Sequence, residues 1–388
     1  MIGQTVSADR IRLCVVVPFR NVGTGLGATI EYFLALTRPP GLTLHMVFVG
    51  ALSDKGGKNI NGVKHGQVSD NVQVELMWSP SSSTNKAVQV EHVWQMLQKS
   101  DQMPDYIAIF DADSRPESDT LVLFLAAVRR NRSALLQMPS LYVCNTETLG
   151  AFADAVAQSI WTLAFEIPRW LRNEAHTRHI HYVVSHGLFI RVDVLKQYPI
   201  PLESNVEDIL YGFTLYFHGI VPDVLPAYDV ARGPNEMRHC ILQKAKWFCG
   251  CVYATQAQFN IFRNQVILKP IMRRHLTSLW WLMGYFTILF VFVLMIMTSA
   301  ITISMVLLIA TCFYIFHYCL PAVITIDQLS HAALGSKMPN RIGLICYAIS
   351  GGVLYYCLYN VGPWFGLLNA IRHLSFLRAA NKIGQTQL

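Results

Sequence analysis

The chain has 388 residues, of which 53% are hydrophobic and 14% charged, and its formal net charge is +7 at pH 7. This length accommodates one large or two ordinary domains, and so low a charged fraction argues against a wholly soluble protein. The basic excess does not indicate nucleic-acid binding, because much of it flanks apolar segments near the C-terminus and does not lie in a soluble region.

The first 240 residues alternate between patterns typical of strands and of helices. We expect strands at residues 12–20, 44–49, 72–78, 107–110 and 135–143, and after the turn at 185–187. We expect helices at residues 28–36, 87–99, 118–130, 148–170 and 209–217. This alternation predicts an α/β domain with a mostly parallel sheet, in which ligands bind at the carboxyl ends of the strands.

Two carboxylates, Asp111 and Asp113, follow the predicted strand that ends at Phe110. Side chains two residues apart in an extended segment point the same way, so the pair converges just past the strand. Carboxylates with open coordination positions suit Mg²⁺ or Mn²⁺ shared with substrate phosphates. The alternative for so short a pattern is a solvated polar turn that closes the strand.

Two further motifs lie downstream. Glu207 and Asp208 introduce a predicted helix, where adjacent carboxylates are ordinary capping residues in most proteins and a general base is the functional alternative. Gln243, Lys246 and Trp247 stand in a segment that is rich in aromatic residues and poor in acids. We interpret residues 241–272 as an interfacial amphipathic segment with this motif.

The remaining residues, 273–388, contain two long uncharged stretches, Leu276 to Ile326 and Ile342 to Ile371. Since about 20 apolar residues cross a bilayer, the stretches predict a transmembrane domain of about three helices. We place these spans at residues 276–297, 301–326 and 342–359. Residues 1–12 lack an apolar signal segment, so we expect a multi-pass membrane protein whose first 270 residues are cytosolic.

Taken in order, the motifs resemble those of the membrane-integrated family-2 inverting glycosyltransferases. Their catalytic domain has the Rossmann-like GT-A fold, and cellulose, chitin and hyaluronan synthases and ceramide glucosyltransferase belong to this branch. The resemblance covers about residues 12–262. It rests on Val-Val-Val-Pro-Phe-Arg-Asn at 15–21, Asn85-Lys86-Ala87, Asp111-Ala112-Asp113, Glu207-Asp208 and Gln243-x-x-Lys246-Trp247.

The resemblance implies a role for each matched residue. Asp113 and Asp111 would hold Mg²⁺ or Mn²⁺, and Asp208, with Glu207 beside it, would be the catalytic base. The nucleotide-sugar donor would contact Pro18, Arg20, Asn21, Asp54, Lys86, Asp111 and Ala112. The diphosphate or the acceptor would contact Gln243, Lys246, Trp247 and His186.

The sequence departs from the family pattern in two places. The family aspartate that helps to hold the nucleotide base is absent from its usual position, where the stretch is Val49 to Asp54. Asp54 is the shifted candidate for that role, and the identity of the base stays open. Lys246 stands where the family has arginine, so the planar fork that grips a phosphate in two places is lost while the charge is kept.

The resemblance implies transfer of a sugar, with UDP-sugars favoured, and a β-linked product from an α-linked donor. We expect the acceptor to be a lipid that enters from the membrane or a short lipid-linked glycan, and a growing polysaccharide is the alternative. A function of another class is a catalytically inactive membrane scaffold that binds nucleotide sugars, which the two departures would permit.

Overall fold

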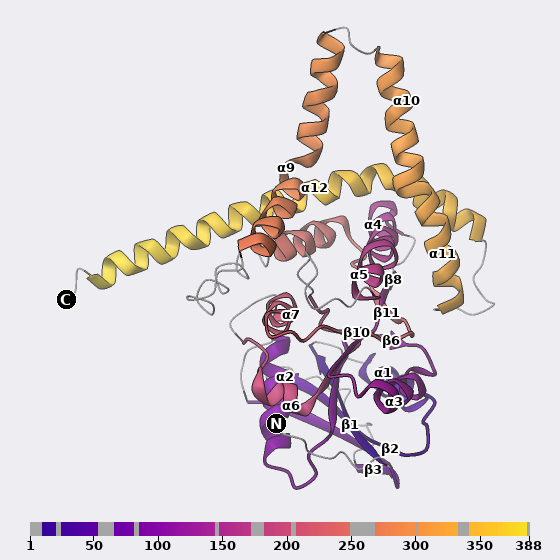
Figure 1. The fold of residues 1–388 in the computed structure, drawn as a ribbon, viewed down its shortest axis with the longest axis vertical. Helices are drawn as coiled ribbons and strands as arrows, with labels where there is room; N and C mark the ends of the chain where they lie inside the picture. Colours follow the sequence, from indigo (N-terminus) through magenta and orange to yellow (C-terminus); the bar gives the residue numbers. More distant parts are fainter. Residues whose placement is uncertain are drawn as a thin grey trace. The chain divides into compact units, whose positions relative to one another are not determined.

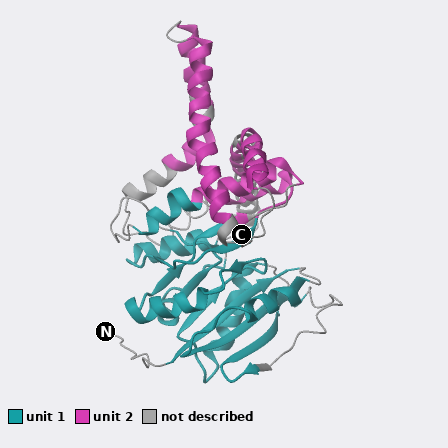
Figure 2. Ribbon diagram, turned by 90° about the vertical axis from the view of Figure 1, so that its right-hand side faces the viewer, with its two compact units in different colours: residues 1–141, 162–177, 181–232 teal, residues 142–161, 178–180, 233–388 magenta. Residues whose placement is uncertain are grey.

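The computed structural model describes residues 10–20, 25–52, 66–80, 85–143, 147–171, 182–202, 207–248, 268–298, 302–332 and 341–385. The chain divides into two units, coloured separately in Figure 2. Unit 1 comprises residues 1–141, 162–177 and 181–232, and unit 2 comprises residues 142–161, 178–180 and 233–388.

Unit 1 is built on an eight-stranded sheet with the strand order β10-β7-β9-β5-β1-β2-β4-β3. Figure 1 labels β1, β2, β3 and β10 of this sheet. Its central strands pair in parallel, and β9 and β3 run antiparallel to their neighbours. The predicted α/β class with a mostly parallel sheet is confirmed. The strands are β1 (Ile11–Phe19), β2 (Leu42–Ala51), β3 (Gly66–Ser69), β4 (Val72–Ser79), β5 (Tyr106–Ile109), β7 (Leu135–Gln137), β9 (Leu188–Arg191) and β10 (Asp223–Val224).

Helices cover both faces of this sheet, which is why its central strands are apolar throughout. On one face α1 (Gly25–Leu34) and α3 (Thr120–Asn131) pack on alternate residues of β1, such as Val15 and Val17. On the other face α2, α6 and α7 pack on Cys14 and Val16. These three helices span Lys86–Gln98, Val192–Gln197 and Glu207–Phe217. Because alternate side chains of a strand point to opposite faces, the residues of β1 contribute to two separate hydrophobic cores.

The predicted strand at residues 135–143 is wrong as a single element. It forms two strands, β7 and β8 (Ser140–Val143), which belong to different sheets. Pro139 separates them, and proline lacks the amide hydrogen that a continuous ladder requires. The second, three-stranded sheet contains β8, β6 (Arg115–Pro116) and β11 (Asp229–Arg232). In it Asp229 pairs with Pro116, next to the Asp111–Asp113 turn in the sequence.

Gly187 precedes β9 with a φ of 63°, and a Cβ built there would lie 2.7 Å from the Cβ of Met138. Gly219 has a similar φ of 75° but open space around it. Both Gly→Ala changes add left-handed strain, and only Gly187→Ala also forces a clash. We therefore expect Gly187→Ala to lower the free energy of unfolding by about 1 to 2 kcal/mol more than Gly219→Ala, measured by denaturant titration. Equal losses of unfolding free energy in the two variants would show that the Met138 side chain moves aside at no cost.

The described part of unit 2 is mainly helical, and two of its helices approach each other closely at small residues. Tyr318 donates hydrogen bonds from its hydroxyl to the carbonyl oxygens of Ala153 (3.1 Å) and Ala348 (3.2 Å). A Cβ at Gly351 would lie 2.7 Å from the Cβ of Ala153, so the glycine permits close approach of two helices. The helices are α4 (Leu149–Trp161), residues 237–248, α9 (Leu268–Met297), α10 (Ile303–Tyr314), α11 (Leu320–Ala332) and α12 (Arg341–Gln385).

A π-helical turn at Ile315–Cys319 joins α10 to α11. Within the described residues, the continuous helix that results, over Ile303–Leu329, is the one that is long and apolar enough to cross a membrane. It covers most of the second predicted span. The apolar helix at Arg341–Tyr355 falls short of that length, so the predicted multi-pass arrangement is not supported.

Candidate active site

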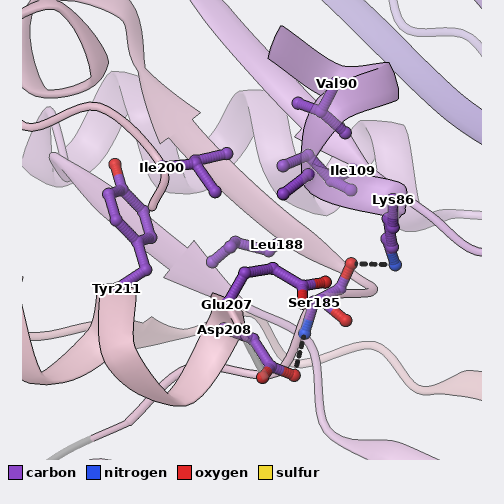
Figure 3. Close-up of a pocket in the computed structure, with 10 residues that line it drawn as sticks. Lys86, Val90, Ile109, Ser185, Leu188, Ile200, Glu207, Asp208 and Tyr211 are labelled. Carbon is purple, nitrogen blue, oxygen red and sulfur yellow. Dashed lines mark hydrogen bonds between the residues drawn. The ribbon is translucent and has the colours of Figure 1, made fainter. Parts of the chain in front are cut away.

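A small pocket in unit 1 brings together side chains from four segments of the chain (Figure 3). Lys86 begins α2, Ile109 ends β5, Ser185 precedes β9, and Glu207 and Asp208 begin α7. The rest of the pocket wall is Ala87, Val90, Leu188, Ile200 and Tyr211, which makes it largely apolar. Two of the predicted motifs, separated by about 120 residues, therefore contribute to one cavity.

Lys86 connects this pocket to the predicted metal motif. Asn85 caps α2, with its side chain accepting a hydrogen bond from the amide of Ala87 at 2.9 Å. The cap holds Lys86 in the first turn, where its ammonium group donates to the Asp111 carboxylate and to the carbonyl oxygen of Ser185, the latter at 2.5 Å. Lys86 is therefore a cation that offsets the charge of Asp111.

Asp113 lies in the turn that follows β5 and is partly buried. Burial, together with the nearby Asp111 carboxylate, raises the pKa of the Asp113 carboxyl above its ordinary value. A divalent cation offsets both effects, and two carboxylates leave coordination positions for phosphate oxygens and water. The donor set thus fits Mg²⁺ or Mn²⁺, although no group of three or more His, Cys, Asp or Glu side chains in the described part of the chain has the arrangement of a metal site.

Asp208 is held at the first turn of α7 by two amide groups. One carboxylate oxygen accepts from the amide of Ile209 at 2.8 Å, and the other accepts from the amide of Ser185 at 3.2 Å. Asp208 therefore acts in part as a capping residue, because one of its oxygens accepts a hydrogen bond from an amide of the first helical turn. The same carboxylate also lines the pocket, so capping and proton transfer are compatible.

His186 is buried, with 5% of its surface exposed. Its Nδ1 lies 2.7 Å from Asp229 Oδ2 and its Nε2 lies 3.5 Å from Ser140 Oγ. Burial disfavours the imidazolium, but the hydrogen bond to Asp229 and the charge of that carboxylate outweigh it, so the pKa of His186 is raised. Its assignment to the diphosphate or acceptor stays a prediction.

The remaining predicted donor contacts are spread over the carboxyl ends of β1 and β5. Pro18 is buried within β1 and Arg20 is exposed just after it. The carbonyl oxygen of Ala112 accepts a hydrogen bond from Thr29 Oγ1 at 2.8 Å. Asn21 and Asp54 lie outside the described residues.

Gln243, Lys246 and Trp247 belong to unit 2, in the helix at residues 237–248. Lys246 is exposed, whereas Lys244, two residues earlier, is buried and forms an ion pair with the fully buried Asp154. The Lys244 ammonium also lies 5.9 Å from the ring centroid of Trp247.

Three further residues near the site were not identified from the sequence. Ser114, Gln137 and Asp229 are all fully buried and bind the segment at residues 182–187 or the Asp111–Asp113 turn. They stand far apart in the sequence and match no motif. Of the three, only Gln137 could have been noticed in the sequence, because it is a polar residue in an otherwise apolar strand.

The family model described as "Glycosyl transferase family group 2" matches residues 106–326, more than half of the 388-residue chain. The match begins at β5 and includes the Asp111–Asp113 turn, Asp208 and the 237–248 helix. A search among curated proteins gives no match.

Solved structures also match the chain along most of its length. A mannosyltransferase, PcManGT from Pyrobaculum calidifontis in complex with GDP-Man and Mn²⁺, is 14% identical with a TM-score of 0.48, over 89% of this chain and 87% of that chain. TarS residues 1–349 from S. aureus in complex with UDP is 12% identical with a TM-score of 0.44, over 89% and 90%.

Proposed function

Since this chain belongs to glycosyl transferase family group 2 and is a glycosyltransferase, we propose that it moves a sugar from a nucleotide-sugar donor to an acceptor hydroxyl in one displacement. The observation that carries the proposal is the shared pocket. Lys86, which pairs with Asp111, and Asp208 line the same cavity and both bind the backbone of Ser185.

The leaving group in such a reaction is a nucleoside diphosphate, whose charge must be neutralised. Asp113 and Asp111 would hold Mg²⁺ or Mn²⁺, which supplies Lewis-acid charge at the diphosphate when bound. Lys86 adds a second positive charge from the chain itself. Its ammonium already bridges Asp111 and Ser185, so it is oriented before substrate enters.

The nucleophile in this proposal is an acceptor hydroxyl that loses its proton to Asp208. A carboxylate can act as the general base in this step, and Asp208 is a carboxylate that lines the pocket and is held in place by two amides. The hydroxyl oxygen attacks the anomeric carbon, the bond to the diphosphate oxygen breaks, and the proton passes to Asp208. One displacement inverts the anomeric centre.

We place the acceptor among lipids or short lipid-linked glycans. One observation supports this assignment: the helix at Ile303–Leu329 has the length and composition of a membrane span. Membrane association through that helix is part of the proposal, with the catalytic unit on the cytosolic side.

The proposal is tested by nucleotide release from a panel of UDP- and GDP-sugars, using the full chain in detergent with Mn²⁺ and a membrane lipid extract. We expect release with at least one donor and a product that is extended by a single sugar. A polymeric product would contradict the lipid acceptor and favour polysaccharide synthesis. Binding without release for every donor would favour the inactive scaffold.

A further inference from the structure

The backbone of Ser185 is the point at which the two candidate catalytic groups meet. Its carbonyl oxygen accepts from Lys86 Nζ at 2.5 Å, and its amide donates to Asp208 Oδ2 at 3.2 Å. Because Lys86 also pairs with Asp111, two residues, Lys86 and Ser185, connect the proposed metal carboxylate to the proposed base. Any shift of Ser185 therefore changes the separation of the two groups.

Gln137 holds both neighbours of Ser185. Its Oε1 accepts from the amide of Val184 at 2.9 Å, and its Nε2 donates to the carbonyl oxygen of His186 at 2.9 Å. Gln137 is fully buried and belongs to β7, a strand of the main sheet. The sheet thereby fixes the backbone on each side of Ser185.

Asp229 makes a second connection, from the turn of the proposed metal motif to the same segment. Its Oδ2 accepts from Ser114 Oγ at 2.8 Å and lies 2.7 Å from His186 Nδ1. Ser114 Oγ in turn accepts from the amide of Asp111 at 3.1 Å. Asp229 and Ser114 are completely buried, so these bonds are shielded from water.

We propose that His186 and Asp229 are a positioning pair, which holds the Asp111–Ser114 turn and the backbone of Ser185 at a fixed separation. The pair touches no substrate, and acts by keeping Lys86, Asp111 and Asp208 in register. A displacement of about 1 Å costs on the order of 10²-fold in rate where reacting groups must be aligned. This inference rests on the proposed function and gives His186 a role other than direct contact with the diphosphate or acceptor.

Two polar variants of His186 separate positioning from simple packing. His186→Asn places an amide nitrogen where Nδ1 lies, so it keeps a donor for Asp229. His186→Gln places it where Nε2 lies, so it loses that donor while remaining polar and of similar size. His45→Leu is the matched control, since His45 also pairs with a carboxylate in unit 1, Glu75, at 3.1 Å and does not line the pocket.

The first measurement is deuterium uptake by the peptide that contains residues 183–187, on the full chain without ligand. We expect faster uptake in His186→Gln, and uptake close to the wild type in His186→Asn and His45→Leu. Equal uptake in the wild type and His186→Gln overturns the positioning role, whether or not a donor has been found. The uptake measurement therefore tests the positioning role independently of the proposed function.

The second measurement is steady-state turnover with the donor identified by the nucleotide-release panel. We expect His186→Gln to lower kcat on the order of 10²-fold with KM within about threefold, and His186→Asn to recover most of the rate. A raised KM with unchanged kcat would show direct binding, and equal losses in both variants would show that packing alone matters. If no donor is turned over by the wild type, the proposed function fails and the uptake experiment still decides the positioning role.

Discussion

Asp208→Asn is expected to lower turnover by about 10² to 10⁴-fold, the usual contribution of a positioned general base. The amide cannot take the proton of the acceptor hydroxyl. It does keep the size of the carboxylate, and its oxygen still accepts from an amide such as that of Ile209. The first turn of α7 should therefore persist. Steady-state nucleotide release with a saturating donor measures the effect.

The matched control for this variant is Asp223→Asn. Asp223 also accepts a hydrogen bond, from Ser133 Oγ at 2.5 Å, but it does not line the pocket. We expect turnover within about twofold of the wild type, because nothing in the proposed reaction involves β10. Similar losses in both variants would mean that any lost carboxylate in unit 1 disturbs the protein, and would remove the support for Asp208 as the base.

Asp113→Asn is expected to abolish the stabilisation of the protein by Mn²⁺. A ligand at a hundred times its dissociation constant stabilises the folded state by about 2.7 kcal/mol. In the wild type, Mn²⁺ should therefore raise the melting temperature by several degrees at pH 7.5. The variant lacks the partly buried carboxylate of Asp113 and should show no such rise. Thermal melting with Mn²⁺ and with EDTA measures both.

The pH dependence of the metal-free protein gives the same variant a second signature. The pKa of Asp113 is raised on folding, so the folded state holds this proton more tightly than the unfolded chain does. Its stabilising effect is present below the unfolded pKa of about 4 and is lost as the pH rises through the folded value. In EDTA we therefore expect Asp113→Asn to gain stability relative to the wild type as the pH rises from 4 to 7.5.

Asp193→Asn is a control whose stability, relative to the wild type, should change with pH in the opposite direction. Burial of Asp193 raises its pKa, but the hydrogen bond and charge of Arg191 outweigh this and leave the pKa lowered. That stabilisation is present above the unfolded pKa and lost as the pH falls, so this variant should lose some stability at pH 7.5 and keep the response to Mn²⁺. Loss of the Mn²⁺ response in Asp193→Asn would contradict Asp113 as the specific ligand.

The parallel strands were predictable because they are buried on both faces. The apolar runs Leu13 to Phe19 and Ile107 to Phe110 end at the polar residues Arg20 and Asp111, and both form central strands. The antiparallel direction of β9 could not be predicted, since a short apolar strand carries no signal of its direction. The division of residues 135–143 depends on Pro139 and on pairing with distant β11, of which only the proline is visible locally.

In the candidate site, too, residues in short motifs could be predicted, and residues that act through distant partners could not. Asp111, Asp113 and Asp208 stand in short motifs, so their proximity to strand or helix ends could be predicted. Gln137 and Asp229 act through bonds to residues about 45 positions away, and a sequence alone does not reveal such partners. The buried Lys244 is a further example, because its partner Asp154 lies 90 residues earlier.

The two carboxylate sites have separate tasks in the proposed reaction, Asp113 in metal-dependent donor binding and Asp208 in proton transfer. Calorimetric titration of the donor in the presence of Mn²⁺, with the wild type and both Asn variants, tests this separation most directly. We predict a dissociation constant for Asp208→Asn within about twofold of the wild type and no Mn²⁺-dependent binding for Asp113→Asn. Equal loss of donor binding in the two variants would contradict the account.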